Sequence, residues 1–255
     1  MTAPEKEPGM LIRPYGDRRD DGVVQLSFVL PVPPGERARQ AAAEVARQMG
    51  LTQVHVASME AAADRYTFFV VYARTAAAVD YAALQVPEVV SRKRGFDELN
   101  GLALREVGRR IVVLGACTGS DAHTVGIDAI MNMKGFSGDY GLERYACFDA
   151  SNLGAQVESA ALARACAERG ADAVLVSQVV TQRDVHRENA RQLIDELARL
   201  GLRQRVVALL GGPRIDHRLA LELGYDAGFG PGTRPSEVAN FLVHEVLRRM
   251  GKDVP

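Results

Sequence analysis

Side chains that can do chemistry stand close together in the stretch DAHTVGIDAIMNMKG: an acid and a histidine, Asp121 and His123, and eleven residues later a lysine, Lys134. The pair directly follows the apolar run RRIVVLGA, so we expect it on a loop after a buried strand. A carboxylate beside a histidine can fix the tautomer of the ring and make it a better metal ligand. The alternative is a loop histidine that binds nothing.

Few kinds of metal site use a single histidine as their protein ligand. A zinc site needs three or four protein ligands, and a non-haem iron site needs two histidines and a carboxylate. No other histidine, cysteine or acid is spaced to complete such a site, because His186, His217 and His244 fall on different predicted helices. One axial histidine is enough where a macrocycle already holds the metal, as in haem or a corrinoid. The haem attachment pattern C-x-x-C-H does not occur.

Glycines and a serine follow the other predicted strands. Ser177 ends the run ADAVLVS, Gly211 and Gly212 end RVVALLGG, and Gly230 lies in GFGPGT. A glycine after a strand is usually part of a turn. Their occurrence at one sheet edge favours close approach of a large ligand, because glycine leaves the backbone accessible.

Lys134 has two interpretations. A lysine near the end of a predicted helix stabilises the helix dipole. A lysine amine can instead form a Schiff base with an aldehyde cofactor. The segment GFSG follows at once, so we expect Lys134 beside a turn that can move.

The residues from 101 onward alternate apolar strands with amphipathic helices. The expected strands are Arg109–Ala116, Glu143–Asp149, Ala171–Ser177, Arg205–Gly212 and Tyr225–Gly230. Nearly continuous apolar runs are typical of parallel strands buried on both faces. Five strands, each followed by a helix, predict an α/β domain with a doubly wound, flavodoxin-like parallel sheet over residues 101–255, with ligands beyond the carboxyl ends of the strands. Residues 1–100 read as a smaller α+β domain.

The composition gives no support for a nucleic-acid-binding, membrane-spanning or disulfide-rich protein. The formal net charge of −1 gives no sign of a nucleic-acid partner, and no apolar run is long enough to span a membrane. Three distant cysteines, Cys117, Cys147 and Cys166, favour reduced thiols in the cytoplasm, although Cys117 adjoins the Asp121 loop.

The segment DAHTVG matches the D-x-H-x-x-G pattern of cobalamin-binding domains, which the chain also resembles in Ser177 and in the Gly211–Gly212 pair. The resemblance implies that His123 replaces the cofactor's own base as the lower axial ligand of cobalt. Asp121 would be its partner, and Gly126 would leave room for the displaced nucleotide tail. The serine and the glycines, including Gly230, would border that tail.

Further segments resemble the β subunits of lysine 5,6-aminomutases over nearly the whole chain: GDYGLERY, SNLGAQV, LVSQVVTQRDVH, GGPRI, GYDAGFGPGT, PYGDRRDDGVVQLSFVLPVP and YTFFVVYA. This resemblance implies that the chain binds adenosylcobalamin and that its N-terminal domain serves dimerisation. It also implies that Lys134 forms an imine with pyridoxal 5'-phosphate held in the TIM barrel of a larger α subunit, in an α2β2 assembly.

The reaction implied is a radical 1,2-shift of the terminal amino group of D-lysine or L-β-lysine from C6 to C5. One alternative is an ornithine aminomutase subunit, although we expect those enzymes to fuse the cobalamin domain to the barrel in one long chain. Another is a corrinoid carrier for methyl transfer, which would share the histidine loop but would not need Lys134. A flavodoxin-like signalling or structural protein without a cofactor is a third.

Overall fold

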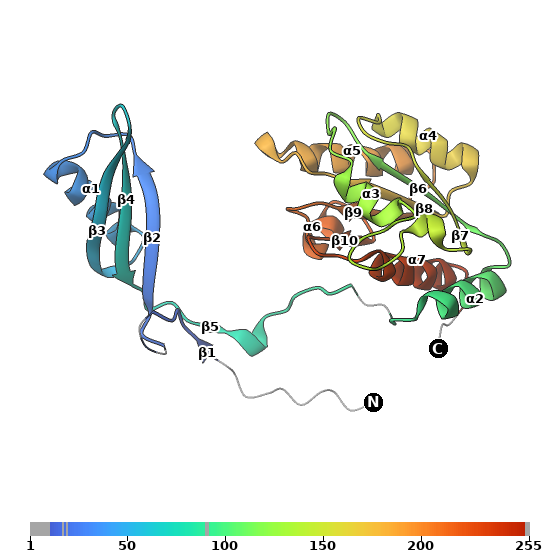
Figure 1. The fold of residues 1–255 in the computed structure, drawn as a ribbon, viewed down its shortest axis with the longest axis horizontal. Coiled ribbons are helices and arrows are strands. Elements are labelled where there is room, and N and C mark those ends of the chain that lie inside the picture. The colour runs from blue at the N-terminus through green and yellow to red at the C-terminus, as the bar shows by residue number, and fades with distance from the viewer. Residues whose placement is uncertain (1–10, 17, 19, 90–91, 253–255) are drawn as a thin grey trace. The chain divides into compact units, whose positions relative to one another are not determined.

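The computed structural model describes residues 11–16, 18, 20–89 and 92–252, and its chain divides into two compact units, Met1–Gln85 and Val86–Pro255 (Figure 1). The expected boundary at residue 100 falls inside helix α2 (Phe96–Val107). That helix belongs to the second unit, because Leu99 and Ala103 pack into its core and Asn100 accepts a hydrogen bond from the backbone N–H of Cys147 at 2.9 Å. No helix among the described residues is long and apolar enough to cross a membrane.

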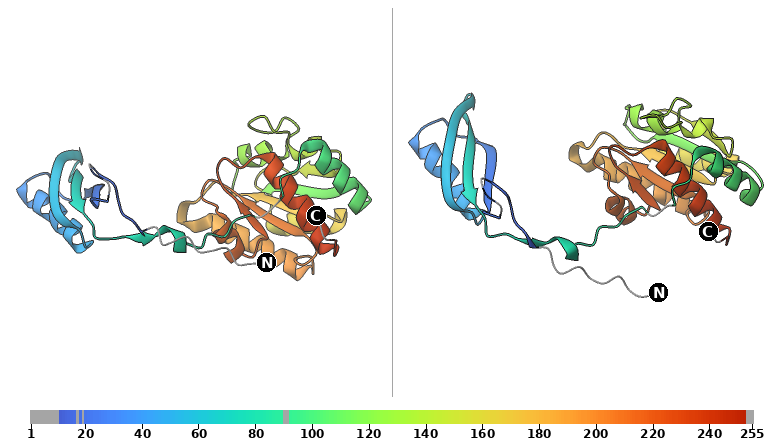
Figure 2. Two further views of the ribbon diagram at one scale, coloured as in Figure 1. Left: turned by 90° about the horizontal axis from the view of Figure 1, so that it is seen from below. Right: turned by 60° about the horizontal axis from the view of Figure 1, so that its bottom comes forward.

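The first unit is a three-stranded antiparallel sheet in the order β2-β4-β3, with one helix. Its elements are β2 (Val23–Leu30), α1 (Glu36–Gln48), β3 (Thr52–Ala63) and β4 (Tyr66–Arg74). Both views of Figure 2 show α1 against one face of this sheet. The small side chains of Ala42 and Ala46 let the helix lie close to Phe69 and Val71. Two short strands, β1 (Leu11–Ile12) and β5 (Val79–Asp80), pair beside it, and β5 leads into the 3-10 helix η1 (Tyr81–Ala83).

The second unit confirms the predicted flavodoxin-like sheet. Five parallel strands lie in the order β10-β9-β8-β6-β7. They are β6 (Ile111–Cys117), β7 (Phe148–Asn152), β8 (Ala173–Ser177), β9 (Val207–Gly211) and β10 (Ala227–Phe229). Along the chain the order runs 2-1-3-4-5, so the direction of winding reverses between β6 and β8.

Helices cover both faces of this sheet. Helices α2, α3 (Val125–Met131) and α7 (Pro235–Arg249) share one core with alternate strand residues such as Val113 and Leu175. Helices α4 (Ser159–Arg169), α5 (Val185–Arg199) and α6 (His217–Glu222) share the other core with Leu114 and Val176. This two-sided burial explains why the strands read as continuous apolar runs.

The second strand of this sheet was predicted too early. In place of a strand beginning at Glu143, the chain forms a short 3-10 helix, η2 (Leu142–Arg144), and β7 begins only at Phe148. Leu142 and Tyr145 are buried in the core from this turn. The apolar residues before Phe148 therefore fill the core without belonging to the sheet.

Candidate functional site

The Asp121 loop lies at the point where the sheet reverses its winding. Residues 118–124 follow β6, and residues 178–181 follow the neighbouring strand β8. Asp121 joins the two loops: one carboxylate oxygen accepts the backbone N–H groups of Val179 and Val180, and the other accepts the N–H of His123 at 3.0 Å. Burial alone would raise the pKa of Asp121, but hydrogen bonds from Val179, His123 and Val180 outweigh it and lower the pKa. The side chain is therefore a buried carboxylate anion.

His123 is held by one ring nitrogen and exposed at the other. Its Nδ1 lies 3.0 Å from Asp121 Oδ1, while 60% of the histidine side chain is accessible to solvent. A carboxylate at Nδ1 places the ring proton there and leaves the lone pair of Nε2 available. Among the described residues Nε2 has no partner. This is the arrangement of a histidine prepared to bind a metal.

His123 is not part of a multidentate metal site in the described part of the chain. Within the described ranges, no group of three histidine, cysteine or acidic residues is placed to bind an ion. A metal at His123 would therefore have to arrive inside a larger ligand.

A buried polar network, which was not predicted from the sequence, supports the loop. Gln178 Nε2 donates to the hydroxyl of Thr118 at 2.8 Å and to its carbonyl oxygen at 3.1 Å. Asn189, on α5, donates to Gln178 Oε1 at 3.1 Å. Thr118 and Gln178 are fully buried, and Asn189 nearly so. A polar network that is satisfied and buried fixes one backbone conformation, here that of the residues leading to Asp121.

Cys117 also supports this loop. Its Sγ lies 3.2 Å from the carbonyl oxygen of His123 and donates to it. Burial, with a smaller contribution from the charge of Asp121, raises the pKa of the thiol to about 11. The group is therefore protonated at neutral pH and is not a nucleophile.

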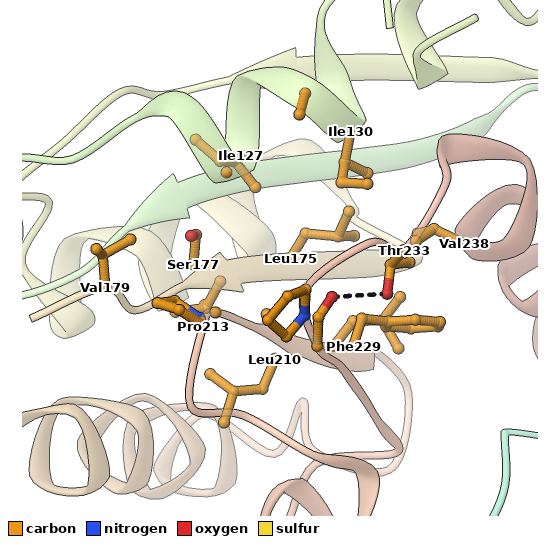
Figure 3. A pocket seen from close by; sticks show the side chains of 18 of the residues that line it. Ile127, Ile130, Leu175, Ser177, Val179, Leu210, Pro213, Phe229, Thr233 and Val238 are labelled. Atoms are coloured by element: carbon orange, nitrogen blue, oxygen red, sulfur yellow. Dashed lines mark hydrogen bonds between the residues drawn. The ribbon is translucent and has the colours of Figure 1, made fainter. Parts of the chain in front are cut away.

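A cavity of about 400 Å³ opens beside this loop, between α3 and the carboxyl ends of β8, β9 and β10. Figure 3 shows its walls: Ile127 and Ile130 of α3 face Leu175 and Ser177 of β8, with Leu210 and Phe229 opposite. The predicted residues Gly126, Ser177, Gly211, Gly212 and Gly230 all line it. Asp121, His123 and Lys134 lie outside the wall.

Close packing requires a glycine at position 212, where a Cβ atom would lie 2.1 Å from the carbonyl oxygen of Gln178. A Cβ atom on Gly126 would lie 2.9 Å from Ser177 Oγ, a terminal hydroxyl that would have to turn away. Gly230 is tight as well, since its Cβ would lie 3.0 Å from the carbonyl oxygen of Ile215. At Gly211 the nearest protein atom would be 3.7 Å away, so a side chain there would take up cavity space.

Lys134 lies in a turn beyond the end of a helix, and not within the last turn of the helix as one of the two interpretations requires. Helix α3 ends at Met131, and Lys134 lies exposed in the turn that follows. Its backbone N–H donates to Asn132 Oδ1 at 3.0 Å. Among the residues that the structure describes, its amine has no hydrogen-bond or ion-pair partner. The helix-dipole interpretation therefore loses its basis, and a free amine remains.

Sequence reasoning missed several apolar members of the cavity wall. They include Val179, Pro213, Phe136 and Val238, and the hydroxyl side chain of Thr233 was missed as well. Their types are ordinary in a core or a turn, so only their position in the fold marks them. The cavity suits a ligand group with apolar surface, because its lining is largely apolar and includes glycines that leave the backbone accessible. Together with one available histidine nitrogen, these features fit a corrinoid whose nucleotide tail enters the domain.

Comparison with known proteins agrees with this geometry. Residues 111–239 match the family of B12 binding domains, and residues 11–88 match the dimerisation domain of D-ornithine 4,5-aminomutase. The fold and these matches define a cobalamin-binding protein.

Two curated relatives give the particular family. The lysine 5,6-aminomutase beta subunit of Acetoanaerobium sticklandii is 49% identical over 239 residues, which cover 94% of this chain and 91% of that protein. The subunit of the same name from Fusobacterium nucleatum is 48% identical over 238 residues, 93% of this chain and 90% of that protein. The chain belongs to the family of lysine 5,6-aminomutase β subunits.

A third relative is more distant. The D-ornithine 4,5-aminomutase subunit beta of Acetoanaerobium sticklandii is 28% identical over 238 residues. The match covers 91% of this chain but only 30% of that protein. The ornithine enzyme's chain is therefore much longer than this one.

Proposed function

We propose that this chain is the subunit that carries adenosylcobalamin in a lysine 5,6-aminomutase, with His123 as the cobalt ligand and Lys134 as the covalent link to a second cofactor. The observation that carries the proposal is the Asp121–His123 pair: one ring nitrogen is fixed by a buried carboxylate, and the other is free beside a cavity bordered by Gly126 and Ser177. When bound, adenosylcobalamin would supply the radical that removes hydrogen, and pyridoxal phosphate the aldehyde that carries the migrating nitrogen.

The chain's own residues would bind and aim these cofactors. Asp121 holds the imidazole in one tautomer, so that Nε2 would be available to bind the metal. Ser177, Gly211, Gly212 and Gly230 border the space for the nucleotide tail, and Gly126 keeps α3 clear of it. Lys134, exposed on its turn, presents the amine that would bond to a cofactor on another subunit.

The proposal extends to the substrate and the assembly, and membership of the family supports it. The amino group of D-lysine or L-β-lysine would move from C6 to C5, on pyridoxal phosphate held in the TIM barrel of a larger α subunit. The first unit would join two copies of this chain, giving α2β2. The three cysteines are free and buried, which suits the reducing cytoplasm.

The other candidates have less support. A methyl-transfer carrier would use the Asp121–His123 loop but would have no use for a free amine on the Lys134 turn. An ornithine enzyme is disfavoured because the lysine relatives match over 90% or more of their own length, and the ornithine relative over 30%.

The test is electron paramagnetic resonance of the cobalt(II) form, on this chain co-purified with its larger partner. With ¹⁵N-labelled histidine in the protein and unlabelled cofactor, wild type should show ¹⁵N coupling from one axial nitrogen, and His123→Ala should lose it. His55→Ala, which removes an exposed histidine from β3 in the other unit, is the matched control and should keep the coupling. Unchanged coupling in His123→Ala would show that His123 is not the cobalt ligand.

A further inference from the structure

The turn that carries Lys134 is one closed piece of backbone. We call residues 132–141 the Lys134 turn. The N–H of Gly135 donates to the carbonyl oxygen of Asn132 at 2.8 Å, and Phe136 and Asp139 exchange two backbone hydrogen bonds of 3.0 Å. Such a hydrogen-bonded loop moves as a unit, because bending it at one residue breaks bonds at the others.

Glycine contacts close this turn from inside. A Cβ on Gly135 would lie 1.9 Å from the carbonyl oxygen of Asp139, and one on Gly141 would lie 1.9 Å from that of Asn132. Both limbs of the turn are therefore in backbone contact. A shift of one limb must be followed by the other.

Phe136 connects this turn to the cofactor cavity. It is two residues beyond Lys134 and forms part of the cavity wall, yet 47% of its surface is accessible to solvent. A large exposed aromatic ring on the wall of a cavity gains burial when the cavity is filled. Met133, next to Lys134 on the other side, is also exposed at 53% but does not line the cavity.

A second contact ties the turn to the opposite wall. The hydroxyl of Ser236, at the start of α7, donates to Asp139. The same segment of chain supplies Thr233 and Val238 to the cavity. A ligand between these walls would therefore touch the turn directly at Phe136 and indirectly through α7.

We propose that Phe136 is a positioning residue for Lys134: filling the cavity buries the Phe136 ring and fixes the whole Lys134 turn, so that the amine is presented in its working position only when cobalamin is bound. This inference rests on the proposed function. In this proposal Phe136 contacts neither the cobalt nor the reacting atoms. Its consequence is an order of events, in which the cobalamin-loaded subunit is the form competent to join the second cofactor.

The test is amide hydrogen exchange of the full chain with and without saturating adenosylcobalamin, with binding followed separately by absorbance. The N–H groups of Lys134, Gly135, Phe136 and Asp139 are all hydrogen-bonded, so their exchange reports opening of the turn. In wild type, cobalamin should slow exchange in residues 133–139 by about tenfold, the order expected if much of the exposed ring surface becomes buried.

Three variants isolate the ring. Phe136→Ala should still bind cobalamin but lose most of the slowing, and Phe136→Leu should restore much of it because a branched apolar side chain can still be buried. Met133→Ala, the matched exposed residue outside the cavity, should behave as wild type. Cobalamin should also change the rate at which acetic anhydride modifies Lys134. This change should be largest in wild type and Met133→Ala, smaller in Phe136→Leu and smallest in Phe136→Ala.

The outcomes separate this inference from the function on which it rests. Binding of cobalamin with no change in exchange over residues 133–139 would overturn the inference and leave His123 as the cobalt ligand. Equal slowing in wild type and Phe136→Ala would also overturn it. A chain, folded by circular dichroism, that binds no cobalamin with or without its partner would overturn both.

Discussion

The loop at residues 118–124 and the Lys134 turn present their functional side chains in opposite ways. In the loop the side chain itself is fixed, since His123 Nδ1 meets a carboxylate that is only 1% exposed. In the turn only the backbone is fixed, since Lys134 donates through its main-chain N–H. A metal ligand needs one ring orientation, whereas a tether must reach a group on another subunit. Under the proposed roles, each segment is fixed at the part that its task requires: the ring of His123 in the loop, and the backbone of the Lys134 turn.

The supports behind the two segments also differ. The loop rests on buried polar groups, Thr118, Gln178 and Asn189, that bond to one another. The turn rests on backbone contacts at Gly135 and Gly141. A buried polar network resists any displacement, because a broken bond leaves an unsatisfied group. A glycine-closed turn at the surface can move as a body.

Removing the free amine should have the largest effect. Lys134→Ala should lower turnover by at least about 1000-fold, because the proposed covalent link is made by this amine. Cobalamin affinity should stay within about threefold of wild type, since Lys134 lies outside the cavity wall. Steady-state kinetics and an absorbance titration of the same preparation measure the two quantities.

The same variant tests whether the tether protects the cofactor. If Lys134 holds the cobalt away from the second cofactor until substrate arrives, Lys134→Ala should cleave the cobalt–carbon bond faster when substrate is absent. Lys252→Ala, an exposed lysine paired with Glu106, is the control. Equal lifetimes of adenosylcobalamin in wild type and Lys134→Ala would contradict the protective role.

Loosening the fixed side chain should have an intermediate effect. Asp121→Ala should weaken cobalamin binding by about 10- to 100-fold, the usual result of removing the carboxylate behind a ligating histidine. Asp226→Ala is a matched control, since Asp226 is also a hydrogen-bonded carboxylate, paired with Arg203 and Arg249 at the other end of the sheet. It should lower the unfolding midpoint and leave affinity unchanged. Equal losses of affinity in both would mean that Asp121 acts through stability alone.

The sequence predicted the parts of the fold that depend on periodicity. The apolar runs around Val113, Leu175 and Leu209 are buried on both faces and read correctly as parallel strands. The second strand was misplaced because Leu142 and Tyr145 fill the core from a turn, and local pattern cannot tell such burial from a strand. The boundary expected at residue 100 lies inside α2, whereas the two units divide between Gln85 and Val86. The charged residues of α2 suggested a linker, although Leu99 and Ala103 pack in the core of the second unit.

The residues of the candidate site also fall into those that a local pattern predicts and those that depend on the fold. Asp121, His123, Ser177 and the glycines could be named from the sequence, because their spacing after strands is itself a local pattern. Gln178, Asn189 and Phe136 could not. Each has an ordinary residue type, and its place depends on contacts with residues distant in the chain, as Gln178 with Thr118. Predictions that depend on such contacts need the fold.

The smallest expected effect concerns the glycine contact that closes the Lys134 turn. Gly135 and Gly138 both have a positive φ, 66° and 87°, so alanine at either costs about 1 kcal/mol of backbone strain. Only Gly135 meets backbone, since nothing lies within 4 Å of a Cβ on Gly138. Gly135→Ala must also open the turn, so its total cost to the free energy of unfolding should reach about 2 kcal/mol. Denaturant unfolding of the two variants measures the difference. Equal costs would mean that the turn relaxes freely at Gly135, in which case it could not carry a displacement from Phe136 to Lys134.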